Sequence, residues 1–331
     1  MVINLNKLKE KLKTSYFIAN KIYLFVIFIF LAVEDLTLGF YYFLISVFIY
    51  TWKTLRSKVP IEVDREFESK TFVYKRTKNK DLKLDIWFPS KNNSNYPLVF
   101  FCHGGGWISG FRNQPNNVSW CKYLASKGFA VASIDYRYGC RNTMEDILSD
   151  YTDALDYIKK NSQKLSIDKK RIVLMGLSAG GHLSLLYSTY NTHNKDKEKM
   201  TGIKAVVAYY SPTDLNDIFI SENKSIFSKF ATKQTLKGSP TPKEEIYDYY
   251  SPINWVSKDM VPCLIAHGKM DTTVPFKSSL KFAKKLKELK IEYTFLVHKK
   301  GGHSFDTKLQ DVTTVNILEK TARYIRKAVE S

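Results

Sequence analysis

Two long apolar runs stand at the start of the chain. Residues 16–33 and 36–52 are almost wholly apolar and are interrupted mainly by Asn20, Lys21 and the Glu34-Asp35 pair. Each run is close to the ~20 residues that a membrane-spanning helix needs. The pattern therefore predicts an N-terminal membrane anchor over residues 1–60, built as a hairpin of two helices. A hairpin packed on a globular domain is the alternative.

The charges that flank the two runs indicate an orientation. Only Glu34 and Asp35 lie between the runs, whereas basic residues flank them on both sides: Lys7, Lys9, Lys11, Lys13, Lys53, Arg56 and Lys58. Positively charged flanks tend to stay on the cytoplasmic side of a membrane. We therefore expect both ends of the hairpin, and the rest of the chain, to lie in the cytoplasm. Whether the hairpin spans twice or is re-entrant stays open.

Beyond residue 61, short β-type runs alternate with helical segments. Residues 82–88 alternate apolar and polar side chains with a period of two, which predicts a half-buried strand. Residues 98–102 are continuously apolar, as is typical of a central strand covered on both faces. Similar runs predict strands at residues 130–134, 172–175, 205–210, 263–266 and 293–297, and helices at residues 118–127, 144–160, 179–190, 278–290 and 312–328. This order predicts an α/β domain over residues 61–331, with a mostly parallel central sheet and helices on both faces.

Residues 215–256 interrupt that alternation with mixed polar and aromatic side chains. We expect them to form a small lid insertion over the carboxyl-terminal edge of the sheet. Because ligand pockets are lined by side chains from such scattered loops, the sequence does not identify a substrate.

Composition excludes some classes of function. The 331 residues include 51 Lys and Arg against 32 Asp and Glu, a formal charge of +19. The lysines are spread along surface-type segments, and no nucleic-acid-binding motif accompanies them, so nucleic acid is not an expected partner. A solvated basic surface explains the excess, and a lipid-facing surface is the alternative. The four cysteines show neither CxxC spacing nor the density of a disulfide scaffold.

The segment Gly176-Leu177-Ser178-Ala179-Gly180-Gly181 follows one predicted strand and precedes an apolar helix. A serine presented on a sharp strand-to-helix turn needs very small neighbours, because the backbone there is strained and bulk would clash. The N-terminus of the next helix also directs N–H groups and a positive dipole end toward an anion. Ser178 is therefore a candidate nucleophile, whereas a plain glycine-rich turn is the alternative.

A second glycine-rich segment, His103-Gly104-Gly105-Gly106-Trp107, follows the predicted strand at residues 98–102. A tetrahedral intermediate carries a negative charge on oxygen and needs donors that already point at it. We expect backbone N–H groups of Gly105 and Gly106, with that of Ala179, to form such an oxyanion hole. His103 is expected to hold the loop by hydrogen bonds. A phosphate-binding loop is disfavoured because no GK[ST] sequence follows.

An acid and a base follow in the expected order. Asp271 lies just beyond the predicted strand at residues 263–266, and His303 lies in a glycine-containing loop beyond residues 293–297. The chain order Ser178, Asp271, His303 is that of α/β-hydrolases and not that of chymotrypsin or subtilisin. In this hypothesis His303 takes the proton of Ser178 as general base, and Asp271 fixes the tautomer of the imidazole.

These motifs resemble the hormone-sensitive-lipase and feruloyl-esterase-like (BD-FAE-like) branch of the α/β-hydrolases over about residues 61–331. The resemblance implies a serine carboxylesterase that acts through an acyl-enzyme without a cofactor or metal. It also implies that Asp135-Tyr136-Arg137 and Ser211-Pro212-Thr213-Asp214 line or support the pocket. A membrane-anchored isoprenylcysteine methylesterase has a similar layout of membrane spans followed by this type of domain.

The remaining histidines are weaker candidates for the base. His182 is expected to be a core residue, His193 an exposed one, and His267 and His298 weak substitutes for His303. No pair has the spacing of a zinc hydrolase, so we expect no metal.

The alternatives to a carboxylesterase are a lipase or a prenylcysteine-methylesterase-like enzyme acting on membrane substrates, and a non-catalytic ligand-binding member of the fold. Oligomeric state and preference for ester over amide stay open.

Overall fold

A computed structural model describes residues 57–63, 67–89 and 95–331, together with Tyr41, Ile45, Phe48 and Trp52. The apolar run at residues 16–33, and all but those four positions of the run at 36–52, lie outside the described residues. Within the part that is described, no helix is long and apolar enough to cross a membrane. The membrane hairpin and its topology therefore stay predictions.

In the described chain, one eight-stranded sheet has the order β1-β2-β4-β3-β5-β6-β7-β8. Strands β3 to β8 pair in parallel, whereas β1 pairs antiparallel with β2, and β2 antiparallel with β4. The strands are β1 Ser69–Arg76, β2 Asp81–Trp87, β3 Tyr96–Cys102, β4 Ala130–Ile134, β5 Ile167–Leu177, β6 Ile203–Tyr209, β7 Cys263–Gly268 and β8 Tyr293–His298. The predicted α/β class with a mostly parallel sheet is confirmed. Strand β1 was not predicted, because this edge strand is only partly buried and its sequence shows no clear alternation.

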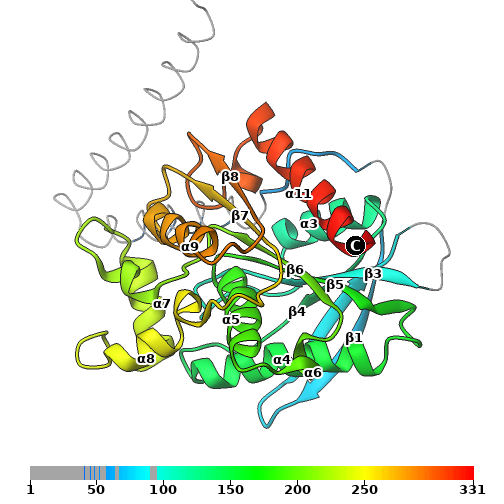
Figure 1. Cartoon of the computed structure of the whole chain (residues 1–331), viewed down its shortest axis with the longest axis horizontal. Helices are drawn as coiled ribbons and strands as arrows, with labels where there is room; N and C mark the ends of the chain where they lie inside the picture. The colour runs from blue at the N-terminus through cyan, green and yellow to red at the C-terminus, as the bar shows by residue number, and fades with distance from the viewer. Residues whose placement is uncertain are drawn as a thin grey trace, which may run out of the picture. The chain divides into compact units, whose positions relative to one another are not determined.

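Helices cover both faces of the sheet (Figure 1). The helices α4 Met144–Lys160, α5 Ala179–His193 and α9 Phe276–Glu288 pack on one face, and α3 Pro115–Ser126 and α11 Val312–Glu330 on the other. Alternate residues of β3 point to opposite faces of the sheet. Phe100 packs in the core beneath α4, α5 and α9, and Phe101 packs in the core beneath α3 and α11. This two-sided burial explains the uninterrupted apolar run at residues 98–102.

The ends of the helices follow local sequence signals. Pro115 stands in the first turn of α3, so the helix begins earlier than the predicted residue 118. Thr143 forms a capping box with Asp146 at the start of α4, which begins at the predicted residue. Asp311 caps α11 by accepting a hydrogen bond from the N–H of Thr314.

Residues 215–256, all of them described, fold into short helices between β6 and β7. They are η1 Leu215–Phe219, α7 Ile226–Leu236, α8 Glu244–Tyr249 and η2 Pro252–Trp255; the remaining short helices are α6 Lys197–Met200 and α10 Phe305–Lys308. Helix α7 lies directly over the loop that follows β3. A Cβ atom placed on Gly106 would be 2.8 Å from Cβ of Ala231 and 3.1 Å from the ring of Phe227. The insertion therefore covers the loop that was expected to supply oxyanion donors.

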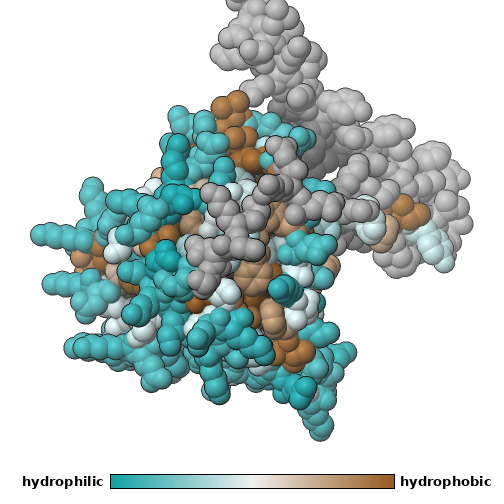
Figure 2. Space-filling model, turned by 90° about the vertical axis from the view of Figure 1, so that its right-hand side faces the viewer, coloured by the Kyte–Doolittle hydropathy of each residue, from teal (hydrophilic) through white to brown (hydrophobic). Residues whose placement is uncertain are grey.

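Hydrophilic side chains cover most of the described part of the face shown in Figure 2, with hydrophobic residues in smaller areas. Cys102, Cys121 and Cys263 are free and buried, whereas Cys140 is free and exposed. The thiols at positions 102 and 263 lie in strands, as expected, and the burial of each raises its pKa.

Candidate active site

Ser178 occupies a sharp turn between β5 and α5. Its φ of 52° and ψ of −117° place a residue that is not glycine in a region of backbone space that side chains disfavour. The turn permits no bulk around it, since a Cβ on Gly180 would lie 2.1 Å from the carbonyl oxygen of Cys102. The N–H of Ser178 donates to the carbonyl oxygen of Tyr209 at 2.8 Å, which fixes the turn to the neighbouring strand. The strain predicted from the glycine pattern is present at this serine.

Three residues that are far apart in the sequence meet at this turn. The Nε2 atom of His303 lies 3.1 Å from Oγ of Ser178. The Nδ1 atom of the same imidazole lies 2.8 Å from Oδ2 of Asp271. Asp271 comes from the loop after β7, and His303 from the loop between β8 and α10. The structure thus brings the three predicted residues together, and the imidazole of His303 lies between the hydroxyl of Ser178 and the carboxylate of Asp271, within hydrogen-bond distance of both.

Asp271 is held as an acceptor on both oxygens. Its Oδ1 atom accepts from the backbone N–H groups of Thr273 at 2.8 Å and Val274 at 2.9 Å, and its side chain is fully buried. Burial alone would raise the pKa of this carboxyl, but attraction to His303 and hydrogen bonds from His267 and His303 outweigh it and hold the pKa well below its usual range. Asp271 is therefore an ionised carboxylate at neutral pH.

His267 is a further partner of Asp271 that the sequence analysis did not assign. Its Nε2 atom lies 3.1 Å from Oδ2 of Asp271, and its Nδ1 atom lies 2.7 Å from Oγ of Ser279. The ring is fully buried at the end of β7, one hydrogen bond farther from Ser178 than His303 is. It therefore supports the acid and does not take the place of the base. Its position four residues before Asp271 is the signal that sequence reasoning could have used.

A second buried carboxylate, that of Asp306, is connected to the imidazole of His303 through Tyr210. Asp306 accepts from Nε1 of Trp120 at 2.6 Å and from the hydroxyl of Tyr210 at 2.8 Å. The ring of Tyr210 lies 4.6 Å from that of His303, measured between centroids. Burial raises the pKa of Asp306. No sequence motif distinguishes this residue, because its donors come from distant segments of the chain.

The predicted oxyanion loop runs beside the nucleophile. A Cβ atom on Gly104 would lie 3.3 Å from Cβ of Ser178. Gly105 and Gly106 follow with φ of 120° and 61°. A Cβ on Gly105 would lie 2.1 Å from the carbonyl oxygen of Ser109, so the loop excludes a side chain there. Ala179 is the first residue of α5, where helical N–H groups have no partner within the helix.

His103 and His182 are buried around this loop, and the ring of each lies against a backbone carbonyl oxygen rather than against the hydroxyl of Ser178. Nδ1 of His103 lies 2.6 Å from the carbonyl oxygen of Gly104, and its ring stacks on that of Tyr136 at 4.3 Å. His182 lies edge-on to Trp107, with Nε2 2.8 Å from the carbonyl oxygen of Tyr250. Burial lowers the pKa of each imidazole to about 4, so both are neutral at pH 7.

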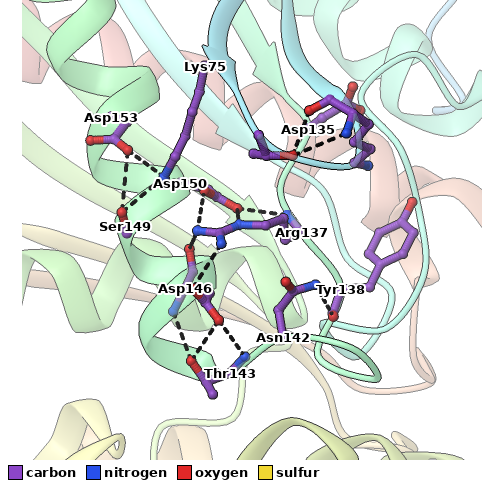
Figure 3. Close-up of polar contacts among 12 residues, drawn as sticks. Lys75, Asp135, Arg137, Tyr138, Asn142, Thr143, Asp146, Ser149, Asp150 and Asp153 are labelled. Atoms are coloured by element: carbon purple, nitrogen blue, oxygen red, sulfur yellow. Dashed lines mark hydrogen bonds and ion pairs between the residues drawn. The ribbon is translucent and has the colours of Figure 1, made fainter.

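An ion-pair network holds the segment after β4 (Figure 3). The guanidinium of Arg137 donates to Asp150 at 2.8 Å and to Asp146 at 2.9 Å, and Lys75 also pairs with Asp150 at 2.7 Å. The carboxylate of Asp150 is fully buried on α4. The network therefore attaches the segment after β4 firmly to one helix and to β1.

The residues next to Arg137 contact the loop that holds the predicted oxyanion donors. The hydroxyl of Tyr136 donates to the carbonyl oxygen of His103 at 3.1 Å, and the N–H of Gly139 donates to that of Trp107 at 2.8 Å. The hydroxyl of Tyr138 donates to the carbonyl oxygen of Gly110. The segment 135–139 is thus fixed on one side by salt bridges and braces the loop on the other.

Among the residues that the structure describes, no group of three or more His, Cys, Asp or Glu side chains has the arrangement needed to hold a metal ion. The chemistry available at the site is that of a hydroxyl, an imidazole, a carboxylate and backbone N–H groups. Such a set can transfer an acyl group.

Comparison with known proteins gives consistent matches. A family profile described as BD-FAE matches residues 84–286. Esterase LipC of Mycobacterium tuberculosis is 28% identical over 67% of this chain and 57% of its own length. Isoprenylcysteine alpha-carbonyl methylesterase ICME of Arabidopsis thaliana is 24% identical over 69% of this chain and 55% of its own length. The chain thus spans little more than half of each of these relatives.

Solved structures share the fold. A truncated form of a carbohydrate esterase from gut microbiota superposes with a TM-score of 0.67 at 22% identity, covering 81% of this chain and 99% of that one. Butyrate-bound esterase Est2 of Thermogutta terrifontis gives a TM-score of 0.62 at 23% identity, covering 78% of this chain and 94% of that one. At these identities the likeness shows the architecture alone.

Proposed function

Since the chain belongs to the BD-FAE family, we propose that it is a serine carboxylesterase with Ser178 as nucleophile, His303 as general base and Asp271 as the acid that orients the base. One observation carries the proposal. The imidazole of His303 lies within hydrogen-bond distance of Oγ of Ser178 on one side and of Oδ2 of Asp271 on the other. Acyl transfer requires a nucleophile that bonds to a base, and a base that bonds in turn to an orienting acid.

In the proposed mechanism, His303 accepts the proton of Ser178 at Nε2 while Oγ attacks the ester carbonyl carbon. The resulting oxyanion is stabilised by N–H groups of Gly105, Gly106 and Ala179, because they are fixed in place before the charge develops. The imidazolium then protonates the leaving alkoxide, and an acyl-enzyme remains on Ser178. Water, deprotonated by His303, releases the acid and restores the serine.

The named relatives favour ester hydrolysis without fixing a substrate. LipC is described as an esterase, and ICME as a methylesterase of isoprenylcysteine. A lipase and a prenylcysteine-methylesterase-like enzyme thus remain forms of the same proposal. Rates for p-nitrophenyl esters of increasing acyl length would identify the preferred acyl group. A non-catalytic ligand-binding protein is the competing proposal.

The test is the variant Ser178→Ala, measured on the full chain with p-nitrophenyl acetate. We expect the rate to fall by ~10^6 while the circular dichroism spectrum stays that of the wild type, because removing a nucleophile abolishes the covalent route. A fluorophosphonate should label wild-type protein once, at Ser178. Full activity of the alanine variant, or labelling of another residue, would contradict the mechanism. A folded wild type with no ester hydrolysis would favour the ligand-binding alternative.

We also propose, from the apolar runs at residues 16–33 and 36–52 alone, that the chain is tethered to a membrane with both ends in the cytoplasm. A reporter that is active only in the cytoplasm, fused after Ser331, should be active. A silent fusion, together with activity of an externally active reporter at the same junction, would refute this topology.

A further inference from the structure

Helix α7 exposes a stripe of large apolar side chains. Ile226 is 84% exposed, Phe227 48% and Phe230 50%. The opposite side of the helix is buried through Ala231, Thr235 and other residues, so α7 is already packed on the body. Apolar side chains on the outer face therefore contribute little to the fold, and clustered exposed apolar residues usually mark a contact surface.

Along residues 223–238, which include α7, the charged side chains are all of one sign, and the exposed Glu222 lies just before them. Between residues 223 and 238 the chain has four lysines and no Asp or Glu. Lys224, Lys233 and Lys237 are exposed. The ammonium group of Lys233 lies 5.8 Å from the centre of the Phe219 ring. A helix that combines phenylalanine and isoleucine on its outer face with flanking lysines has the character of an interfacial helix.

One residue of the stripe, Phe227, lies against the loop that follows β3, whereas Ile226 is not among the α7 residues nearest to Gly106. Phe227 belongs to the stripe, and its ring is the one that a Cβ atom on Gly106 would meet at 3.1 Å. Gly106 is in the loop that runs beside Ser178. Anything that binds to the outer face of α7 would therefore lie next to the predicted oxyanion donors.

We propose that the outer face of α7 docks on an anionic lipid bilayer, and that the enzyme takes esters dissolved in that bilayer. The proposal rests on the esterase function above for its substrate, but not for its docking. Phosphate and carboxylate headgroups would pair with the lysines, each contributing on the order of fivefold in affinity. Ile226 and Phe230 would enter the boundary between headgroups and acyl chains.

A bilayer fits these observations better than a second copy of the chain. Two copies that met through α7 would bring the lysines of both helices together, whereas an anionic surface neutralises them. The described body begins at Ser57, soon after the apolar run that ends at residue 52. At about 3.5 Å per residue, such a short connection would keep the body beside any membrane that holds the run.

The docking test uses an environment-sensitive fluorophore on the full chain. Cys140 is the exposed cysteine of the described residues, so Cys140→Ser provides the background. Ile226→Cys is the probe site, and Val312→Cys is its control. Both positions are exposed, at 84% and 75%, and each is the first residue of a helix with a side-chain cap. The protein is reconstituted in phosphatidylcholine vesicles with about 30% phosphatidylserine, an anionic surface like that of a cytoplasmic leaflet.

We expect the fluorophore at position 226 to shift to the blue and to be quenched by doxyl-labelled lipid, and the one at position 312 to do neither. Equal behaviour of the two positions would overturn the docking proposal. If the fluorophore at position 226 is not quenched and sedimentation velocity shows a dimer, the outer face of α7 binds a second copy of the chain, and the docking proposal is also overturned. Neither readout depends on catalysis.

The substrate part is tested by Ile226→Asp against Val312→Asp. Aspartate suits the first turn of either helix, so both variants should fold. For a p-nitrophenyl ester of long acyl chain carried in the same vesicles, we expect Ile226→Asp to raise KM about tenfold, as loss of buried apolar surface and added repulsion predict. For soluble p-nitrophenyl acetate both variants should match the wild type. An unchanged KM on vesicles would refute the lipid substrate, whereas no turnover of either ester by wild type would instead refute the esterase proposal.

Discussion

Asp271→Asn replaces the orienting carboxylate with an amide of the same shape. In the wild type, Oδ1 accepts two backbone N–H bonds, from Thr273 and Val274, and Oδ2 accepts from the rings of His303 and His267. The amide has one acceptor and one donor end. The amide oxygen is expected to face the backbone N–H groups of Thr273 and Val274, because a backbone N–H can only donate. Turning the amide round would leave these buried donors unpaired, at a cost of ~1–3 kcal/mol each.

The amide NH2 then points at the imidazoles. Nδ1 of His303 must become an acceptor, which moves the ring proton to Nε2, where it faces Ser178 and prevents the ring from acting as base. Loss of the productive tautomer in a comparable triad lowers kcat ~10^4-fold. That factor corresponds to ~5.5 kcal/mol in the activation barrier.

The assay is kcat for p-nitrophenyl acetate, with circular dichroism to establish folding. Asp306→Asn is the matched control, since Asp306 is also a buried carboxylate but accepts from Trp120 and Tyr210 and not from His303. We expect the control to lose less than ~10-fold, because proton transfer to His303 is left intact. If folded Asp271→Asn kept more than about a tenth of the wild-type kcat, or if both variants fell equally, the tautomer argument would be wrong.

Three further outcomes can be measured with the same protein. His303→Ala should reduce kcat about as much as Ser178→Ala does, and the double variant should be scarcely slower than either, because the two residues act as one unit. Arg137→Met removes one of two cationic partners of the buried Asp150 carboxylate, and because Lys75 remains it should cost about 2 kcal/mol in the free energy of unfolding by urea. Arg171→Met breaks a more exposed pair and should cost under ~1 kcal/mol, and equal losses would refute the distinction. In the folded state the pKa of Asp271 is depressed from its ordinary value of 3.8, so the ionised carboxylate stabilises the fold above pH 3.8. This stabilisation is lost as the pH falls through the lower pKa of the folded state. The free energy of unfolding of Asp271→Asn should therefore fall less than that of the wild type as the pH is lowered below about 4, in the same urea titrations.

The sequence by itself determined the elements and the chemistry that is local. The strand at residues 130–134 and the helices beginning at residues 144, 179 and 312 lie where the pattern of apolar side chains placed them. The turn at Ser178 followed from its glycines, because the clash that excludes a side chain at Gly176 is with the backbone of Gly180 and Gly181, only a few residues along the chain. Such features depend on near neighbours, and the amino-acid order records them.

Tertiary structure decided what depends on distant neighbours. The edge strand β1, the order of the sheet and the antiparallel pairing of β2 follow from packing between segments that carry no local mark. His267 and Asp306 gained their places through contacts with Ser279, Trp120 and Tyr210, some of them far along the chain. The outer face of α7 is the clearest case, because a mixed sequence revealed neither which side of that helix would be buried nor that it would lie over Gly106. Burial is a property of the whole fold, and only the assembled sheet and insertion establish it.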